Sequence, residues 1–186
     1  MDLTEKINQI KKGEVIQFDE AYLEDNQKDL IMLIKFLLTD ETYIIYLKKL
    51  WNLIREDELN LIKFDLYVSV LKQPKFNKKI AKFICLKERS LKHLTSNLIG
   101  KCETIEAMQY LIDSYKLNSG NIITGISDCY SYQQKEVIDK LLDMLTEQQK
   151  NMALDRFVRI YLDENNYVKK DVELVSYVLS KKNDWS

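Results

Sequence analysis

Residues 131–162 read SYQQKEVIDKLLDMLTEQQKNMALDRFVRIYL and indicate the fold class most clearly. Apolar residues recur in it at positions i, i+3, i+4 and i+7, which places them on one face of a helix. The series occurs twice, as Ile138, Leu141, Leu142 and Leu145 and as Leu154, Phe157, Val158 and Tyr161. Ser131-x-x-Gln134 and Thr146-x-x-Gln149 both fit the capping box, in which a hydroxyl and an amide satisfy free N–H groups at a helix start. The stretch therefore predicts two consecutive amphipathic helices.

The helical spacing continues on both sides of this stretch, and almost no segment alternates with period two. Val172, Val175 and Leu179 predict a last helix near 171–181. Further helices are expected over 3–10, 18–25, 29–38, 40–51, 58–72, 75–92 and 108–115. The chain breakers Gly13, Pro74, Gly100, Gly120 and Gly125 are expected to separate helices, because glycine and proline favour turns and helix ends.

The composition supports the same fold class. The chain has 186 residues, of which 46% are hydrophobic and 31% charged, with only four glycines and one proline. Sheets need turns that draw on glycine and proline, so a mostly helical protein is expected. We expect one all-helical domain over residues 1–186, with a soft division near 74–100. Its architecture is predicted as stacked antiparallel helical hairpins, a short HEAT-like solenoid, or alternatively as an irregular multi-helix bundle.

The sequence also predicts where the protein acts. Its start, MDLTEK, is not a basic stretch followed by an apolar run, so no secretory signal is expected. The most apolar stretch, residues 30–38, is far shorter than the roughly 20 residues that a membrane span needs. The sequence has three cysteines, Cys85, Cys102 and Cys129, and no two of them form a Cys-x-x-Cys motif. This pattern favours buried thiols in a reducing compartment. A cytoplasmic protein without a membrane partner is therefore expected.

No pattern in the sequence indicates catalysis. The single histidine, His93, has no nucleophile or carboxylate at a spacing that would place both on one helix face. Glycine-rich phosphate loops and Glu-x-x-His metal motifs are missing. Acidic residues such as Asp40 and Asp57 sit at expected helix starts, where capping explains them. The sequence thus predicts no enzyme activity, no catalytic residue, no metal and no cofactor.

Charge is divided unevenly along a chain whose net charge is only −1. Segment 75–92 carries +6, and segment 14–29 carries −5. A lysine-rich amphipathic helix can contact nucleic-acid phosphates, and Lys75, Lys78, Lys79 and Lys82 are the candidates for such contacts. However, only one arginine lies in the basic segment, whereas nucleic-acid binders favour arginine and aromatic side chains. A solvated lysine face is the alternative, and the two charged segments could also cover each other.

Tyrosines near acids form the last conspicuous feature. Aromatic rings supply contact area with little loss of side-chain entropy, which suits a protein interface. The alternative is that each tyrosine packs against a helix end of its own fold. The candidate partner-binding residues are Asp128, Tyr130, Tyr132, Asp163, Glu164 and Tyr167.

The stretch from Ser131 to Tyr167 consists of a capped helix with Leu141-Leu142-x-x-Leu145 and a second with Phe157-Val158-x-x-Tyr161-Leu162-Asp163-Glu164. In this pattern the chain resembles bacterial immunity proteins that neutralise a toxin domain, including those with HEAT-like helical repeats. The resemblance lies in the architecture and transfers no functional residue. It implies tight binding that blocks a toxin without turnover. The first hypothesis is therefore a non-enzymatic inhibitor of a protein partner, and the alternative is a nucleic-acid-binding or regulatory adaptor that acts through segment 75–92.

Overall fold

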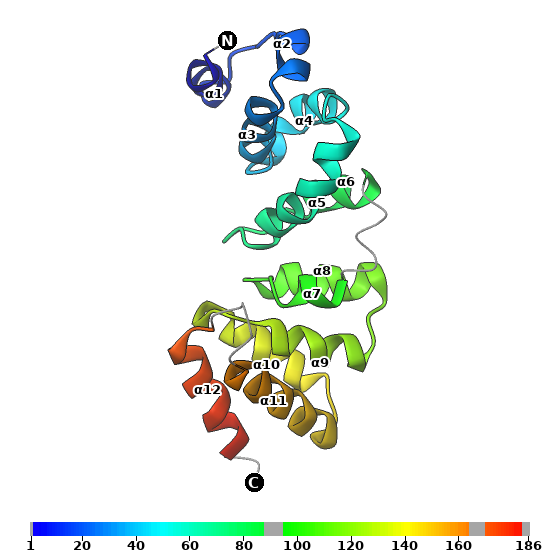
Figure 1. The fold of residues 1–186 in the computed structure, drawn as a ribbon, viewed down its shortest axis with the longest axis vertical. Coiled ribbons are helices and arrows are strands. Elements are labelled where there is room, and N and C mark those ends of the chain that lie inside the picture. Colours follow the sequence, from blue (N-terminus) through cyan, green and yellow to red (C-terminus); the bar gives the residue numbers. More distant parts are fainter. Residues whose placement is uncertain (1, 88–94, 164–169, 184–186) are drawn as a thin grey trace. The chain divides into compact units, whose positions relative to one another are not determined.

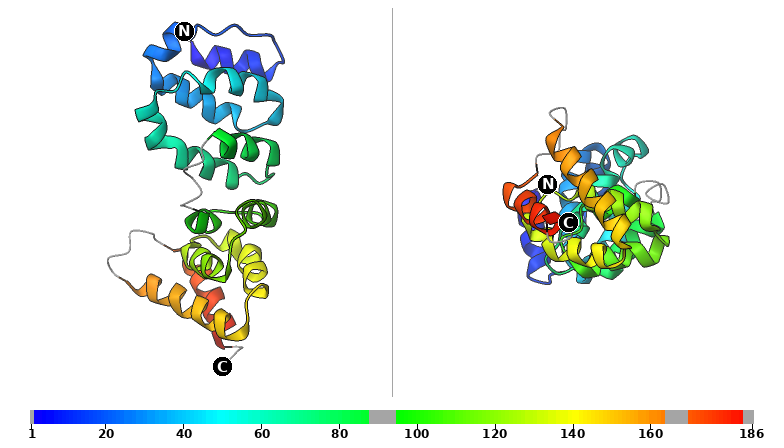
Figure 2. Two further views of the ribbon diagram at one scale, coloured as in Figure 1. Left: turned by 90° about the vertical axis from the view of Figure 1, so that its right-hand side faces the viewer. Right: turned by 90° about the horizontal axis from the view of Figure 1, so that it is seen from below.

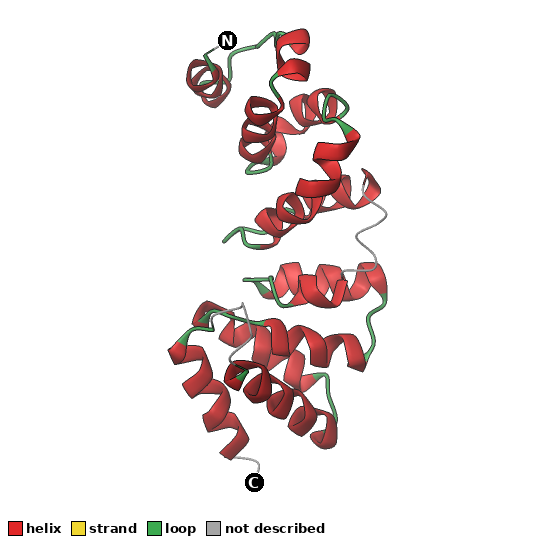
Figure 3. Cartoon of the chain, in the orientation of Figure 1, coloured by secondary structure: helices red, strands yellow, loops and turns green. Residues whose placement is uncertain are grey.

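All regular elements are helical in the part of the chain that the computed structural model describes, residues 2–87, 95–163 and 170–183. Figure 3 shows these helices joined by loops, and the predicted all-α class is confirmed. The chain forms two compact units. The first comprises Met1–Val70 and Lys79–Leu86, and the second comprises Leu71–Lys78 and Lys87–Ser186.

The first unit contains helices from the N-terminal part of the chain. They are α1 (Leu3–Lys11), α2 (Glu20–Asp25), α3 (Gln27–Leu37), the 3-10 helix η1 (Glu41–Tyr43), α4 (Ile44–Trp51), α5 (Glu56–Leu71) and α6 (Lys78–Lys87), of which Leu71, Lys78 and Lys87 belong to the second unit. Helix α3 packs against α1, α2 and α4 and lies between α1 and α4 in Figure 1. Its Leu30, Leu33 and Ile34 side chains are fully buried, whereas Met32 is 59% exposed. Helix α3 is thus buried among α1, α2 and α4 on one side and open to solvent on the other.

Acidic caps and a glycine define helix ends in this unit. Asp2, Asp19 and Asp40 each accept a hydrogen bond from a backbone N–H in the following turn, which satisfies donors that have no partner within the helix. Gly13 follows α1 with a φ of +76°, a left-handed conformation that glycine adopts without steric cost. The expected role of Gly13 is therefore confirmed.

The second unit contains the remaining helices. They are α7 (Thr95–Ile99), α8 (Ile105–Tyr115), α9 (Ser119–Asp128), the 3-10 helix η3 (Tyr132–Gln134), α10 (Lys135–Asp143), α11 (Glu147–Leu162) and α12 (Val172–Asn183). Helix α9 packs against both α7 and α11, and α12 packs against α11 and η3. Helices α11 and α12 lie next to each other in Figure 1 and in the left view of Figure 2. Both predicted capping boxes are present, at Ser131–Gln134 and Thr146–Gln149.

Two expected breakers lie inside a helix instead. Gly120 and Gly125 belong to α9, so the prediction that they separate helices is wrong. A Cβ atom on Gly125 would lie 2.5 Å from Cγ2 of Ile99, which is closer than real Cβ atoms approach a neighbour. Gly125 is therefore the position at which α9 and α7 approach closely.

Helix lengths vary from five residues in α7 to 16 in α5 and α11. A regular stack of HEAT-like hairpins stays a prediction, and the irregular bundle stays its alternative. No described helix combines the length with the apolar character that a membrane crossing requires.

Candidate functional site

Residues 128–134, here called the tyrosine segment, join α9 to α10 and contain three predicted site residues, Asp128, Tyr130 and Tyr132. The fully buried Gln134 side chain holds the segment from within. Its Oε1 accepts hydrogen bonds from the backbone N–H of Tyr130 (2.9 Å) and of Ser131 (3.1 Å). Its Nε2 donates to the carbonyl oxygens of Gly100 and Cys102, both at 2.9 Å. One amide thus ties the segment to the end of α7.

Lys170 and Asp171 hold the same segment from the other side. Lys170 Nζ donates to the carbonyl oxygens of Ser127 (2.5 Å) and Cys129 (2.6 Å) at the C-terminal end of α9, where a positive charge is favoured. The backbone N–H of Asp171 donates to Tyr130 O at 2.8 Å. Asp171 Oδ2 accepts a hydrogen bond from Tyr132 N at 3.3 Å. The backbone of residues 129–132 is therefore fixed by contacts from two distant parts of the sequence.

Asp128 faces cations at the base of the segment. Burial raises the pKa of its carboxyl, while the charges of Lys170, Lys101 and Arg156 act in the opposite direction. Burial also lowers the pKa of Lys170 to about 8. The Lys170 side chain lies over the Phe157 ring, with Nζ 4.2 Å from the ring centroid. Asp128 is half-buried in this arrangement and acts within the fold.

Tyr130 is half-exposed between two lysines. Lys72 Nζ lies 4.6 Å and Lys101 Nζ 4.9 Å from the ring centroid, within the range of cation–π attraction. The hydroxyl donates to Glu103 Oε1 at 3.3 Å. Burial is the main cause of its raised pKa. The ring thus packs between two cationic side chains of the protein itself.

Tyr132 is half-exposed beside an open surface. It packs edge-on against Tyr177 of α12, with ring centroids 6.0 Å apart, and Lys135 Nζ lies 5.0 Å from its ring centroid. Tyr132 and Tyr177 line a hollow of about 380 Å³ together with Val172, Glu173 and Ser176. Val172 is 69% exposed, so an apolar side chain here is left uncovered by the described residues. This hollow can receive an apolar group from outside.

The other predicted partner-binding residues do not join this site. Asp163 is the exposed C-cap residue of α11, outside the tyrosine segment. Glu164 and Tyr167 lie outside the described residues, as do Arg89, Lys92 and His93. The acid beside Tyr130 is Glu103, and the acid beside Tyr132 is Asp171, neither of which the sequence singles out.

The basic candidates Lys75, Lys78, Lys79 and Lys82 are all exposed. Lys79 forms an ion pair with Glu41 at 3.2 Å. Several residues of the acidic segment also have internal roles, because Asp19 caps α2, Glu20 pairs with Lys49 at 2.7 Å and Asp29 accepts a hydrogen bond from the Tyr22 hydroxyl. Contacts within the fold thus account for three of the acids in segment 14–29.

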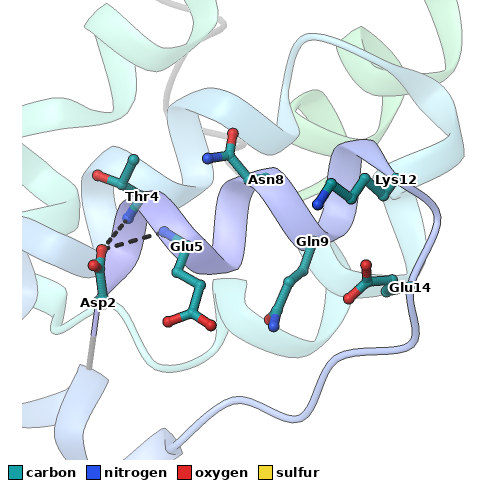
Figure 4. Close-up of a pocket in the computed structure, with 7 residues that line it drawn as sticks. All are labelled: Asp2, Thr4, Glu5, Asn8, Gln9, Lys12 and Glu14. Carbon is teal, nitrogen blue, oxygen red and sulfur yellow. Dashed lines mark hydrogen bonds between the residues drawn. The ribbon is translucent and has the colours of Figure 1, made fainter.

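Another hollow, of about 380 Å³ and lined by polar residues, lies along α1 (Figure 4). Asp2 accepts hydrogen bonds there from the backbone N–H groups of Thr4 and Glu5, and Glu5 and Gln9 extend on the same side of the helix as Glu14. Helix capping explains Asp2. Nothing in this hollow distinguishes it from a solvated helix face.

The described residues contain no cluster of three or more histidine, cysteine or acidic side chains able to hold a metal. Cys102 and Cys129 are buried, and burial raises the pKa of Cys129 to about 12, which keeps its thiol protonated. Cys85 is half-exposed rather than buried. The raised pKa of Cys102 and Cys129 is the opposite of what a thiol nucleophile needs.

Sequence reasoning missed Lys170, Asp171 and Tyr177. Lys170 and Asp171 contact a segment about 40 residues earlier, and no local sequence pattern indicates these contacts. Gln134 was identified as a capping residue, but its bonds to Gly100 and Cys102 were not expected. Neither protein-family models nor curated proteins nor solved structures give a significant match to this chain.

Proposed function

We propose that the chain is a non-enzymatic protein-binding module whose partner contacts the tyrosine segment and the hollow beside Tyr132. A toxin domain, held in an inactive complex, is the partner class that the resemblance to immunity proteins implies. The observation that supports the proposal is a backbone segment fixed from two sides that presents a half-exposed tyrosine next to uncovered apolar surface.

Rigidity at this place favours tight binding. A loop that is already ordered loses little conformational entropy on association, so more of the contact energy appears as affinity. Tyrosine adds a large amphipathic surface with only two side-chain torsions to fix. A partner side chain of apolar character would fill the hollow that Tyr132, Tyr177 and Val172 line.

Site-specific photocrosslinking in the native host tests the proposal. A photoreactive phenylalanine analogue replaces Tyr132 in one variant and Tyr161 of α11, which is 41% exposed, in the other. We expect the first variant to capture one defined polypeptide that the second does not capture. Co-expression of that polypeptide with the chain should relieve whatever growth defect it causes alone. Equal capture by both variants, or no polypeptide at all, would contradict the proposal.

The captured partner then allows a direct measurement of the Tyr132 contribution. Tyr132→Ala is expected to weaken binding at least about tenfold, because truncating a central aromatic contact removes more than about 1.4 kcal/mol. Tyr132→Phe keeps the ring and should stay within about threefold of the wild type. Tyr161→Ala serves as the matched control, and the thermal midpoint of each variant checks that the fold is intact.

The exposure of Lys75, Lys78, Lys79 and Lys82 favours one second candidate, a nucleic-acid-binding or regulatory adaptor. Its affinity for DNA or RNA would fall steeply with salt, because bound lysines release counterions from the phosphates. A flat titration with duplex and single-stranded probes at low salt would remove this candidate.

A further inference from the structure

One face of α11 carries two arginines, of which Arg156 also acts on the carboxyl of Asp128. Arg156 and Arg159 are two of the four arginines in the chain and are three residues apart, on neighbouring positions of the helix surface. Neither forms an ion pair with a carboxylate of the described residues. The Nε atom of Arg156 is moreover buried without a hydrogen-bond partner among those residues. Such a donor costs free energy until an acceptor reaches it.

The two arginines line a hollow of about 310 Å³ between α11 and α9. Its other walls are Ile123 of α9 and Met152 and Asp155 of α11. Met152 is 55% exposed, and its unbranched thioether adapts to different partners. The hollow thus combines guanidinium groups with an apolar, deformable wall.

The lining of the hollow is net positive, because it holds two arginines and one acid. The one acid in its lining, Asp155, is paired with Lys182 at 2.6 Å. Asp128, the nearby acid that faces Arg156, also faces Lys101 and Lys170. Arg156 and Arg159 therefore keep a net positive charge available for an incoming anion, and a guanidinium binds a carboxylate through two parallel hydrogen bonds.

We propose that this α11 face is a second interaction surface, which binds a polypeptide segment carrying an aspartate or glutamate next to an apolar side chain. The carboxylate would pair with Arg156 and Arg159, and the apolar side chain would contact Met152 and Ile123. The surface needs no partner at Tyr132, so it is independent of the function proposed above.

Peptide display against the chain of 186 residues tests this surface without knowledge of a natural partner. The selection is run with the wild type and with Arg156→Gln/Arg159→Gln, and the enriched peptides are then measured by fluorescence anisotropy at low and high salt. Lys48→Gln/Lys140→Gln, which removes two exposed lysines elsewhere, is the matched control for the loss of charge. Arg159→Gln alone, at an exposed position, guards against misfolding of the double variant.

The wild type should enrich peptides that have an acidic residue within two positions of an apolar one. Their Kd should rise at least about tenfold in the double arginine variant, less in Arg159→Gln and not more than about twofold in the lysine control. Affinity should also fall with salt. The proposal is overturned if no such peptide is enriched, or if the enriched peptides bind the arginine variants as tightly as the wild type.

Discussion

At the scale of single residues, buried amides fix the loops of both units. In the first unit Gln27 Nε2 donates to the carbonyl oxygens of Glu24 and Leu53, and its Oε1 accepts from Arg55 N, each at 3.0 Å. Gln134 has the same role in the second unit. A glutamine can satisfy donors and acceptors at once, which suits it to the meeting point of two loops.

Replacement of Gln134 tests this role. Gln134→Leu removes the partner of two backbone N–H groups and two carbonyl oxygens in a buried place, so we expect unfolding to require about 3 kcal/mol less free energy. Urea denaturation followed by circular dichroism measures the loss. Gln133→Leu, at the exposed neighbouring position, should change stability by less than about 0.5 kcal/mol. Similar losses in both variants would show that the amide network contributes little.

Lys170 makes stability depend on pH. Its pKa in the folded protein is about 8, below the ordinary lysine value of 10.5, because burial disfavours its charge. Between these two pH values the unfolded chain therefore binds more protons than the folded chain, and this group makes the fold more stable as pH rises. Cys129 acts oppositely above pH 9, since its folded pKa of about 12 holds a proton that the unfolded chain releases.

The window from pH 8 to pH 9 tests the lysine effect when the wild type is compared with Lys170→Met, because both proteins retain the buried cysteines. The stability of the wild type relative to Lys170→Met should increase by about 1 kcal/mol across this window, because the variant lacks the titrating amine. Urea midpoints of both proteins at several pH values give this difference directly. A difference that stays constant or decreases with pH would mean that Lys170 keeps an ordinary pKa in the fold.

At the scale of elements, periodicity and capping residues predicted most helices. The capping boxes at Ser131 and Thr146, the left-handed Gly13 and the cap at Asp40 are local features that a sequence displays directly. Helix α9 was not expected, because its two glycines were interpreted as breaks. Close contact with Ile99 explains Gly125, and only the tertiary structure contains that contact.

Substitution at Gly125 should reverse the usual effect of alanine in a helix. Gly125→Ala is expected to destabilise the protein by about 1–3 kcal/mol, because the new methyl group overlaps Ile99. Gly120→Ala, in the first turn of the same helix, places a Cβ atom 3.2 Å from the Asn118 side chain alone, so its effect should be much smaller. Thermal unfolding of Gly125→Ala/Ile99→Ala completes a double-mutant cycle, in which the two changes should partly compensate. Purely additive losses would count against the contact.

The candidate site was only partly predictable for the same reason. Tyr130 and Tyr132 were identified as loop tyrosines near acids, but Lys72, Lys170 and Tyr177 come from distant segments. Lysines are so frequent in this chain that no single one stands out. Long-range neighbours of this kind are set by packing, which local sequence patterns do not encode.

At the scale of the whole molecule, each compact unit consists of two separate segments of the chain. Leu71–Lys78 belongs to the second unit, yet the chain returns to the first unit for Lys79–Leu86. Phe76 packs against Tyr110, and Lys72 against Tyr130, within the second unit. Helices α5 and α6 therefore each supply residues to both units.

Such a division predicts cooperative unfolding. In a Trp185→Phe background, fluorescence of the buried Trp51 reports on the first unit, and far-UV circular dichroism reports on all helices. We expect both urea transitions to coincide, because loss of α5 or α6 removes residues from each unit. Two separated midpoints would instead show that each unit is an independent domain.

The hydrogen bonds that hold the tyrosine segment leave its ring positions free to vary in evolution. Backbone atoms, together with Gln134, Lys170 and Asp171, determine the course of the segment, whereas the rings of Tyr130 and Tyr132 contribute none of these hydrogen bonds. If the segment binds a partner as proposed above, mutations at these two positions alter what it binds while the loop keeps its conformation. A scaffold of this kind lets recognition diverge rapidly at little cost to folding, as in antibody loops.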